Sequence, residues 1–483
     1  MNAAEMGRLL QKGIQGDVLW EEYVRKFYSA DASSYRIVPK VVIIPKDEND
    51  IIYAVKFAKK HQKSITSRGS GTGLVGGALN RGIILDMQKF DSVRIVGKYV
   101  QVGAGTKKGI LDEKLEKYGK FFPPNPSVGR YCSVGGMLGN NASGSRSLKY
   151  GSMIDNVLEI TFIDGNGKKI TLPQDVKSGK RILALAGSID RDMIPAVTKN
   201  SSGYRIEHAT SIQDTQKVIV GSEGTLGIIL SAKLKITDVP KNRTLYIIEY
   251  DSASDAACDC PKILDTKPSA VEFVDAITLE GFGLGFDDKT KCLLFVEYDS
   301  GMLGKDITHY TSGRIKKRVS SEKEIKKWWK MRDLSLHFSI KSIKPKDRFP
   351  HIIEDAVVPV ENLAKLFVVI DDLNRKFNTE TITYGHAGNG NIHVRLMADR
   401  QDSAGIKKIA KYYFDRIIQL GGSITGEHGD GLARTEFVKV QYGVKNYDIF
   451  KQLKDLFDPH NILNPGKVIS EKSTMAQNLE GQV

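Results

Sequence analysis

Three histidines and a glutamate lie in two glycine-rich stretches toward the C-terminal end of the sequence. The stretch GHAGNGNIH contains His386 and His393, and the stretch GEHGDG contains Glu427 and His428. Glycine disfavours a helix, so we expect a compact loop to present the first two imidazoles. Two imidazoles and a carboxylate form a common ligand set for Zn, Mn or Fe(II) that leaves positions open for a substrate. Histidines held by ordinary backbone contacts are the alternative.

Three more stretches are rich in Gly, Ser, Thr and Asn. They are RGSGTGLVGG at 68–77, SVGGMLGNNASG at 133–144 and VGSEGTLGI at 220–228. The first contains a G-x-G-x-x-G pattern, but a strand at 83–86 follows it, whereas a dinucleotide-binding fingerprint requires a helix. Small residues still allow backbone N–H groups to approach a diphosphate closely. Such loops between strands predict one extended ligand held from several sides, with ordinary turns as the alternative.

Strands and helices alternate in the part of the sequence that must position these loops. Helix starts are predicted at Asp47–Asp50 and at Thr106, and residues 1–38 are predicted to be helical. A domain boundary is expected near residues 238–240. β-Branched and apolar runs predict strands at 41–44, 64–66, 83–86, 99–102, 157–163, 169–172, 245–249, 293–297 and 356–360. A helix at 361–373 follows the last of these strands, and the alternation indicates an α/β or α+β fold.

Composition narrows the class of protein. The chain has 483 residues, of which 41% are hydrophobic and 27% charged, as in a globular protein of two to four domains. The net charge is 71 − 57 = +14, but no nucleic-acid-binding motif accompanies it. The densest basic segment, 314–330, predicts a solvated helix face, with a docking surface for a partner or a membrane as the alternative. Without a signal peptide or a membrane span, we expect a cytoplasmic protein, peripheral at a membrane if that surface docks there. Its four cysteines indicate reduced thiols.

The order of these motifs resembles a known superfamily. The three Gly-rich loops resemble the FAD-binding half of the vanillyl-alcohol-oxidase (p-cresol-methylhydroxylase) flavoproteins, and the His-rich stretches resemble their D-lactate/glycolate dehydrogenase branch, over roughly residues 35–469. The resemblance implies an α+β fold, with a PCMH-type FAD-binding domain of two subdomains and an α+β cap domain built on an antiparallel sheet. The implied segments are a helical segment at 1–38, the FAD-binding domain at 39–238, the cap at 239–425, a return to the FAD-binding domain at 426–470 and a loose tail at 471–483.

The resemblance also assigns residues to the cofactor. Covalently flavinylated relatives often carry a His in the first loop, where this sequence has Thr72, so noncovalent FAD is implied. Asn464, in the closing motif NPGK, is implied to face the flavin. The other implied FAD contacts are Arg68, Gly69, Ser70, Gly71, Thr72, Gly73, Leu74, Gly76, Gly77, Gly135, Gly136, Asn140, Asn141, Gly144, Gly221, Glu223, Gly224, Gly227 and Ile228.

Metal, base and substrate positions follow from the same resemblance. It implies metal ligation by His386, His393 and Glu427, with His428 as general base, a role that suits an imidazole because its ordinary pKa lies near neutrality. It also implies that Arg332 holds the substrate carboxylate, as a guanidinium does well. Asn389 stands where many relatives have Asp. The segment HIIEDAVVP lacks a lysine that some relatives carry, which argues against a long dicarboxylate.

The implied activity is oxidation of a D-2-hydroxy acid, D-lactate or glycolate foremost, to the 2-oxo acid. Hydride passes to flavin N5, and the electrons pass to an external acceptor such as an iron–sulfur partner, a quinone, another carrier or oxygen. A homo-oligomer without nucleic acid is expected. The enzyme alternative is an ether-lipid synthase resembling alkylglycerone-phosphate synthase, which requires a long apolar channel. A basic nucleic-acid-binding or membrane-surface protein would leave all of these motifs unexplained.

Overall fold

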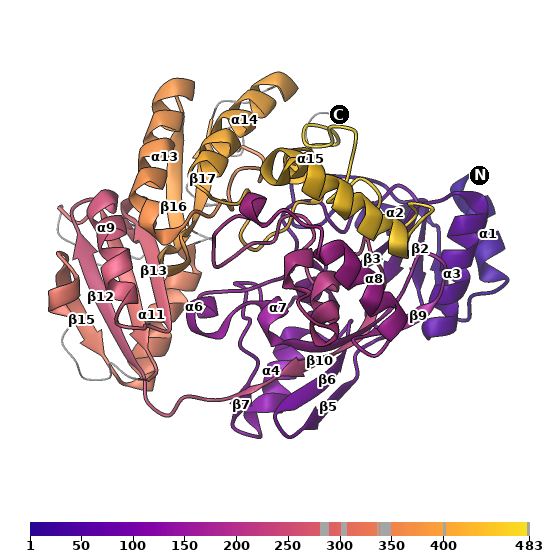
Figure 1. Cartoon of the computed structure of the whole chain (residues 1–483), viewed down its shortest axis with the longest axis horizontal. Coiled ribbons are helices and arrows are strands. Elements are labelled where there is room, and N and C mark those ends of the chain that lie inside the picture. Colours follow the sequence, from indigo (N-terminus) through magenta and orange to yellow (C-terminus); the bar gives the residue numbers. More distant parts are fainter. Residues whose placement is uncertain (281–288, 301–306, 336–337, 339–348, 399–401, 481–483) are drawn as a thin grey trace.

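A computed structural model describes the chain except for residues 281–288, 301–306, 336–337, 339–348, 399–401 and 481–483. Its sheets lie in two regions: an N-terminal region with two larger sheets, and a cap with a third (Figure 1). Helix and strand are mixed, as the α+β expectation requires. The C-terminal segment leaves the cap and returns to the N-terminal region.

The first sheet is mainly parallel. Strands β2, β4 and β3 pair in parallel, and β1 adds an antiparallel edge. Helix α3 begins where Asp47 accepts the N–H groups of Asn49 and Asp50, as predicted. The bounds are α1 (Ala3–Gln11), β1 (Asp17–Leu19), α2 (Glu22–Phe27), β2 (Val41–Ile44), α3 (Glu48–His61), β3 (Ile65–Arg68) and β4 (Ile83–Asp86). The prediction of a helical segment at 1–38 is confirmed for α1 and α2 and wrong between them, where the Asp50 carboxylate accepts the N–H groups of Gln15 and Gly16 and holds a turn before β1.

The second sheet is antiparallel, in the order β5-β6-β10-β8-β9. The predicted hairpin is confirmed, since β8 pairs with β9 across the turn at 164–167. Thr106 does not cap α4: Lys107 precedes the helix, and the Thr106 hydroxyl donates to the Ser92 carbonyl at 3.3 Å. The bounds are β5 (Val93–Val96), β6 (Tyr99–Gly103), α4 (Lys108–Glu116), β7 (Lys120–Phe121), α5 (Val134–Asn140), α6 (Ser147–Tyr150), α7 (Met153–Asn156), β8 (Val157–Ile163), β9 (Lys169–Leu172), α8 (Val176–Ala186), β10 (Ile228–Lys235) and β11 (Thr237–Asp238).

The cap is built on an antiparallel sheet in the order β15-β12-β14-β13-β16-β17, with apolar side chains on both faces. On β12, Tyr246 and Ile248 join the core beneath α9 and α13, whereas Leu245 and Ile247 join the core beneath α11. The bounds are β12 (Thr244–Tyr250), α9 (Ala253–Leu264), β13 (Ala270–Asp275), α10 (Ala276–Glu280), β14 (Cys292–Tyr298), β15 (Arg314–Val319), α11 (Glu322–Asp333), α13 (Leu363–Phe377), β16 (Glu380–His386), β17 (Asn391–Met397) and α14 (Ser403–Gln419).

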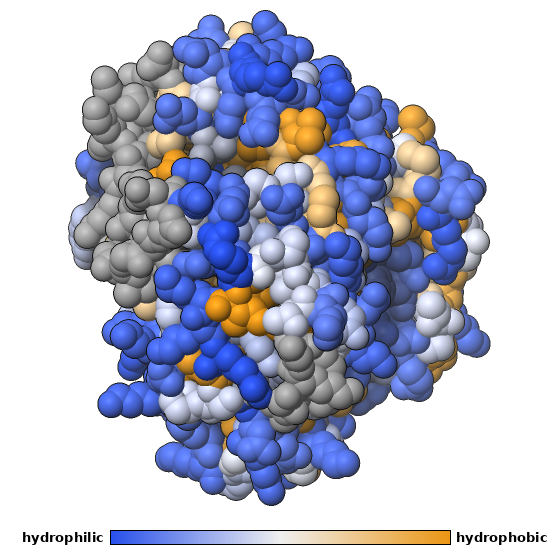
Figure 2. Space-filling view, turned by 90° about the vertical axis from the view of Figure 1, so that its left-hand side faces the viewer, coloured by the Kyte–Doolittle hydropathy of each residue, from blue (hydrophilic) through white to orange (hydrophobic). Residues whose placement is uncertain are grey.

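The basic segment 314–330 is not one solvated helix. It forms β15 and the first part of α11, and Trp328 and Trp329 are buried against the sheet. Part of its charge is neutralised, in the pairs Lys317–Glu324 and Lys326–Glu322. Seen from the cap end, hydrophilic residues cover most of the visible face and hydrophobic ones form small separate patches (Figure 2). No helix of the described residues has the length and apolarity to cross a membrane.

Two further predictions are corrected. Residues 356–360 form single bridges from Val357 to Asn391 and Ser423 and no strand. Val357 exchanges backbone hydrogen bonds with Ser423 at 3.0 and 2.8 Å, whereas the Val358 N–H donates to the Gly390 carbonyl, so the segment pairs with two different partners and continues along neither. The tail is not loose from 471 to 480: Met475 and Leu479 are buried, and Tyr35 donates its hydroxyl to the Met475 carbonyl at 2.6 Å. The remaining elements are α15 (Gly431–Phe457), η1 (Arg191–Met193), η2 (Ile206–His208), η3 (Ile212–Ile219), η4 (Thr308–Tyr310), η6 (Val360–Asn362) and η7 (Ala387–Asn389).

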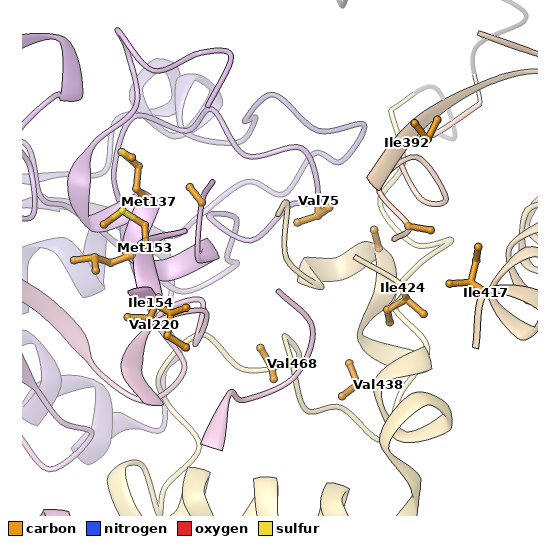
Figure 3. Packing of buried hydrophobic residues seen from close by; sticks show 14 of the residues in the cluster. Val75, Met137, Met153, Ile154, Val220, Ile392, Ile417, Ile424, Val438 and Val468 are labelled. Atoms are coloured by element: carbon orange, nitrogen blue, oxygen red, sulfur yellow. The ribbon is translucent and has the colours of Figure 1, made fainter. Parts of the chain in front are cut away.

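One hydrophobic core joins the cap to the N-terminal region. It runs from Val75 in the first Gly-rich loop and Met137 of α5, through Val438 of α15, to Ile392 of β17 (Figure 3). The second Gly-rich stretch is thus helical over 134–140, and not a loop throughout as predicted, because the Ser133 hydroxyl accepts the Gly136 N–H and starts the helix. Burial of apolar surface contributes about 25 cal/mol per Å². A continuous core of this kind therefore fixes the cap against the loops, and the space between the two becomes a defined site.

Candidate active site

A hairpin of the cap sheet presents the first two histidines. His386 ends β16 and His393 lies within β17, so the expected compact loop is only the short turn η7 between them. The pairing of Tyr384 with His393 puts both histidines on one face of the sheet, with ring centroids 5.3 Å apart. Gly390 permits this turn, because its φ is +68° and a side chain there would meet the Val358 carbonyl.

Glu427 brings the predicted metal ligands together. Its Oε1 lies 3.1 Å from His386 Nε2 and 3.3 Å from His393 Nε2. Its Oε2 accepts from the Ser143 hydroxyl at 2.5 Å and from the Lys199 ammonium at 3.2 Å. Two imidazole nitrogens around one carboxylate oxygen fit a divalent metal of the Zn, Mn or Fe class.

Asp355, which sequence reasoning missed, holds the loop that carries Glu427 and His428. Its Oδ2 accepts the backbone N–H groups of Gly426, Glu427 and His428 at 3.0, 3.0 and 2.8 Å, and the Thr425 hydroxyl at 2.5 Å. Asp355, His393, Glu427 and His428 also offer donor atoms within 4.8 Å of one another. Because the Asp355 carboxylate already accepts these hydrogen bonds, we assign it the role of holding the loop at 425–428 in place.

His428 stands beside the cluster with its ring stacked on that of His393, 5.2 Å between centroids. Its Nδ1 lies 2.8 Å from Glu354 Oε1. Burial opposes the charged imidazole, but the carboxylates of Asp355 and Glu354 outweigh burial and raise the pKa of His428 to about 9. A general base was expected to have a pKa near neutrality. With the protein groups alone, the pKa of His428 lies above that range.

Glu272 of β13 connects the histidines to the predicted carboxylate-binding arginine. Its Oε1 lies 2.8 Å from His386 Nδ1, and its Oε2 is ion-paired with Arg332 of α11. Burial favours the neutral acid, but Arg332 and His386 outweigh burial and hold the pKa of Glu272 below its usual value. Sequence analysis missed Glu272. The one feature that could have pointed to it is the presence of a glutamate within the otherwise apolar strand sequence AVEFVD.

The buried Arg332 side chain lines an outer cavity of about 470 Å³, together with Trp329, Tyr384 and the three histidines. Asn389 points away from the histidines. It accepts from the Ser147 hydroxyl at 3.1 Å and donates to the Thr198 hydroxyl at 2.9 Å. Asn389 thus joins the cap hairpin to the N-terminal region and adds no donor to the cluster.

An inner cavity of about 370 Å³ lies among the Gly-rich loops. The space around Gly73 indicates whether this cavity can hold FAD. A side chain there would meet only Asn140 Nδ2, at 3.7 Å, and would otherwise project into the cavity. A glycine at this position lets the backbone come close to a ligand in the cavity, and a diphosphate bound by backbone N–H groups requires such an approach. The predicted FAD contacts that line the cavity are Arg68, Gly69, Ser70, Gly71, Thr72, Gly73, Leu74, Gly77, Gly135, Gly136, Asn140, Glu223 and Gly224.

Other predicted FAD contacts lie behind this lining. Asn464 donates to the carbonyls of Gly77 and Glu223 at 2.8 and 2.7 Å, and so ties the first loop to the third. Asn141 accepts from the Ile154 N–H and donates to the Asn200 carbonyl. Gly144 lines the outer cavity. The remaining ones, whose backbones support the loops, are Gly76, Gly221, Gly227 and Ile228.

The two cavities meet at the charged cluster, since Glu427, His428 and Arg395 line both of them. Sequence reasoning missed Arg395, although it follows His393 at the spacing that keeps a strand residue on the same face. A substrate in the outer cavity therefore lies between these side chains and a ligand in the inner one.

Two family models match this chain: a FAD binding domain at residues 39–173 and the C-terminal domain of FAD linked oxidases at 239–468. The glycolate oxidase subunit GlcD of Bacillus subtilis is 28% identical over 92% of this chain and 93% of the relative. A D-lactate dehydrogenase of Archaeoglobus fulgidus is 28% identical over 89% of this chain and 91% of the relative. A D-2-hydroxyglutarate dehydrogenase of Escherichia coli is 28% identical, and the chain spans 51% of its length.

Among solved structures, an alkyldihydroxyacetonephosphate synthase superposes with a TM-score of 0.67 at 18% identity, over 96% of this chain and 84% of that one. This likeness establishes the shared fold. The family matches agree with the cavity among the Gly-rich loops. The chain belongs to the FAD-linked oxidoreductases of the vanillyl-alcohol-oxidase/p-cresol-methylhydroxylase superfamily, with a FAD-binding domain followed by the C-terminal domain of FAD-linked oxidases.

Proposed function

We propose that this flavoenzyme oxidises a D-2-hydroxy acid to the 2-oxo acid. The observation that carries the proposal is the convergence of His386, His393, Glu427 and His428 where the cavity among the Gly-rich loops meets a cavity lined by guanidinium groups. FAD bound noncovalently among the Gly-rich loops supplies the hydride acceptor. His386, His393 and Glu427 would hold a divalent cation, which when bound would act as a Lewis acid toward the substrate hydroxyl.

In this proposal the protein orients the acid and moves one proton. Arg332 binds the substrate carboxylate from the side of α11, where Glu272 fixes the guanidinium. His428 faces both cavities and takes the hydroxyl proton at Nε2, while Glu354 holds the opposite ring nitrogen. The pKa of His428 would fall from about 9 with a divalent cation bound beside the ring, so that Nε2 is free to accept this proton. The hydrophobic core around the site keeps these groups at fixed positions, and fixed positions are the main contribution of a protein to hydride transfer.

The electrons then leave for an external acceptor, which we propose to be an iron–sulfur partner, a quinone, another carrier or oxygen. The cysteines, Cys132, Cys258, Cys260 and Cys292, are free thiols and three are buried. Cytoplasmic location and homo-oligomerisation stay predictions.

The outer cavity also weighs against ether-lipid synthesis. A long alkyl or acyl chain requires an apolar channel, whereas much of this wall is charged, with Lys108, Asp112, Glu116, Arg146 and Asp333 among its residues. The structural likeness to the synthase therefore extends to the fold, and the cavity wall favours a small anion.

The test is an anaerobic titration of the purified flavoprotein. D-lactate, L-lactate, glycolate and D-2-hydroxyglutarate are added separately, with and without prior EDTA, while the visible flavin band is recorded. We expect a D-acid to bleach the band, EDTA to abolish the bleaching and added metal to restore it. If no 2-hydroxy acid bleaches the flavin band, the proposal is refuted, and ether-lipid synthesis becomes the favoured alternative.

A further inference from the structure

A buried arginine without a carboxylate partner lies in the wall of the site. Arg395 is 5% exposed and lies two residues beyond His393 on β17, on the same face of the sheet. Its Nε donates to the Tyr384 hydroxyl at 3.4 Å, and its Nη1 has no hydrogen-bond partner among the described residues. A guanidinium is always charged in proteins, and a buried charge is costly unless an anion compensates it.

The neighbouring cations differ from Arg395 in having an ion pair. Arg332 also has nitrogens without a hydrogen-bond partner, Nε and Nη2, but its guanidinium is ion-paired with Glu272. The other buried cations around the histidines are ion-paired, in the pairs Arg332–Glu272, Arg434–Glu354 and Lys199–Glu427. Among the ion pairs of the described residues, Arg395 has none. Burial lowers the pKa of Arg395, whereas the charges of Glu354 and Asp355 act on it from a distance and help raise its pKa, but neither carboxylate forms an ion pair with it. The guanidinium is therefore free to pair with an anion supplied by a ligand.

Arg395 is placed to meet a substrate. It lines both the outer and the inner cavity, whereas Arg332 lines the outer cavity alone. Both guanidiniums lie near the Tyr384 phenol, although one comes from β17 and the other from α11. An acid in the outer cavity therefore meets two separate positive groups, of which only Arg332 already has a protein carboxylate.

We propose, building on the proposed oxidation, that Arg395 binds a second carboxylate and makes this enzyme selective for dicarboxylic 2-hydroxy acids. The missing lysine in HIIEDAVVP argued against such substrates. The structure supplies a cation from the neighbouring strand: the Val394 N–H donates to the Glu354 carbonyl at 3.0 Å, so β17 runs beside that segment and carries Arg395 with it.

The test compares Arg395→Met with wild type on two classes of acid. D-2-hydroxyglutarate and D-malate are the dicarboxylates, and D-lactate is the monocarboxylate. We expect wild type to have the higher kcat/KM for a dicarboxylate. A hydrogen-bonded ion pair of this kind corresponds to about a 10- to 100-fold effect. Arg395→Met should lower kcat/KM for the dicarboxylate by that factor and leave D-lactate within about threefold, and Arg395→Lys should recover part of the loss.

Arg375→Met is the matched control, because it removes the same charge from an exposed position on α13 that lines neither cavity. It should leave the dicarboxylate preference unchanged. Binding of 2-oxoglutarate and pyruvate, followed through the flavin spectrum, reports selectivity without turnover. If no 2-hydroxy acid is oxidised but Arg395→Met still weakens 2-oxoglutarate binding alone, the proposed reaction fails and the anion site stands. Equal losses for both classes, no loss, or a wild-type preference for D-lactate would overturn the inference.

Discussion

Asp355 gives the sharpest prediction about how the site is held. Its Oδ2 accepts three backbone N–H groups and the Thr425 hydroxyl, and its Oδ1 accepts from Asn391 Nδ2 at 3.2 Å. In Asp355→Asn the amide oxygen can take the place of Oδ2, but the new NH₂ then faces the Asn391 NH₂. Bonds to a neutral acceptor are about 1 kcal/mol weaker than bonds to a carboxylate, so the four weakened bonds at this oxygen cost about 4 kcal/mol.

This loss should fall on the loop that carries Glu427 and His428. We expect Asp355→Asn to lower the free energy of unfolding by about 4 kcal/mol and to weaken metal binding and kcat together. Asp275→Asn is the matched control. Asp275 accepts the Thr278 N–H at 3.0 Å and the Thr383 hydroxyl at 3.1 Å, but belongs to the far end of β13. The control should lose stability and keep its metal affinity.

Acid pH provides a second readout. Burial raises the pKa of Asp355, but the charges of His428 and Arg434 contribute to a net pKa below the ordinary value of 3.8. A lowered pKa means that the carboxylate stabilises the fold above about pH 4 and that this contribution is lost as pH falls further. The wild type should therefore lose more stability in acid than Asp355→Asn does. Similar metal affinities in the two Asn variants, measured by titration of the stripped proteins, would refute this account of the loop.

Three further predictions concern the cofactor, the metal and pH. Gly73→Val should fold, because the position is open on the cavity side, and the purified protein should contain little FAD as measured by absorbance. A full flavin content would contradict the assignment of the inner cavity to FAD. Glu272→Gln should weaken metal binding about 10- to 100-fold by releasing the far nitrogen of His386, as measured by metal titration, and unchanged affinity would exclude this role. In chelated protein, the pKa of His428 is about 9 rather than 6.5, so the folded state holds the extra proton and thermal stability should fall as pH rises between these values. His428→Gln should flatten that slope, and a slope that persists would assign it to another group.

The Gly-rich loops and the His-rich motifs could be found without a structure, because residue types and their spacing are enough to indicate the chemistry. A backbone that approaches a diphosphate needs glycines, and a metal needs imidazoles and carboxylates. Strands such as 41–44 and 157–163 were predictable for a similar reason, since β-branched runs between turn residues form them locally.

The sequence by itself therefore determined the cofactor class, the metal-ligand candidates His386, His393 and Glu427, and most of the strands. Only the tertiary structure decided what surrounds them. Glu272 and Asp355 act on residues 114 and 73 positions away, respectively, and no local pattern reports such a distance. Arg395 can be read from the sequence, but its charge becomes informative only when the structure shows that it is buried and forms no ion pair with the described residues. Compensation of charge is a property of the packed molecule, and the sequence alone does not contain it.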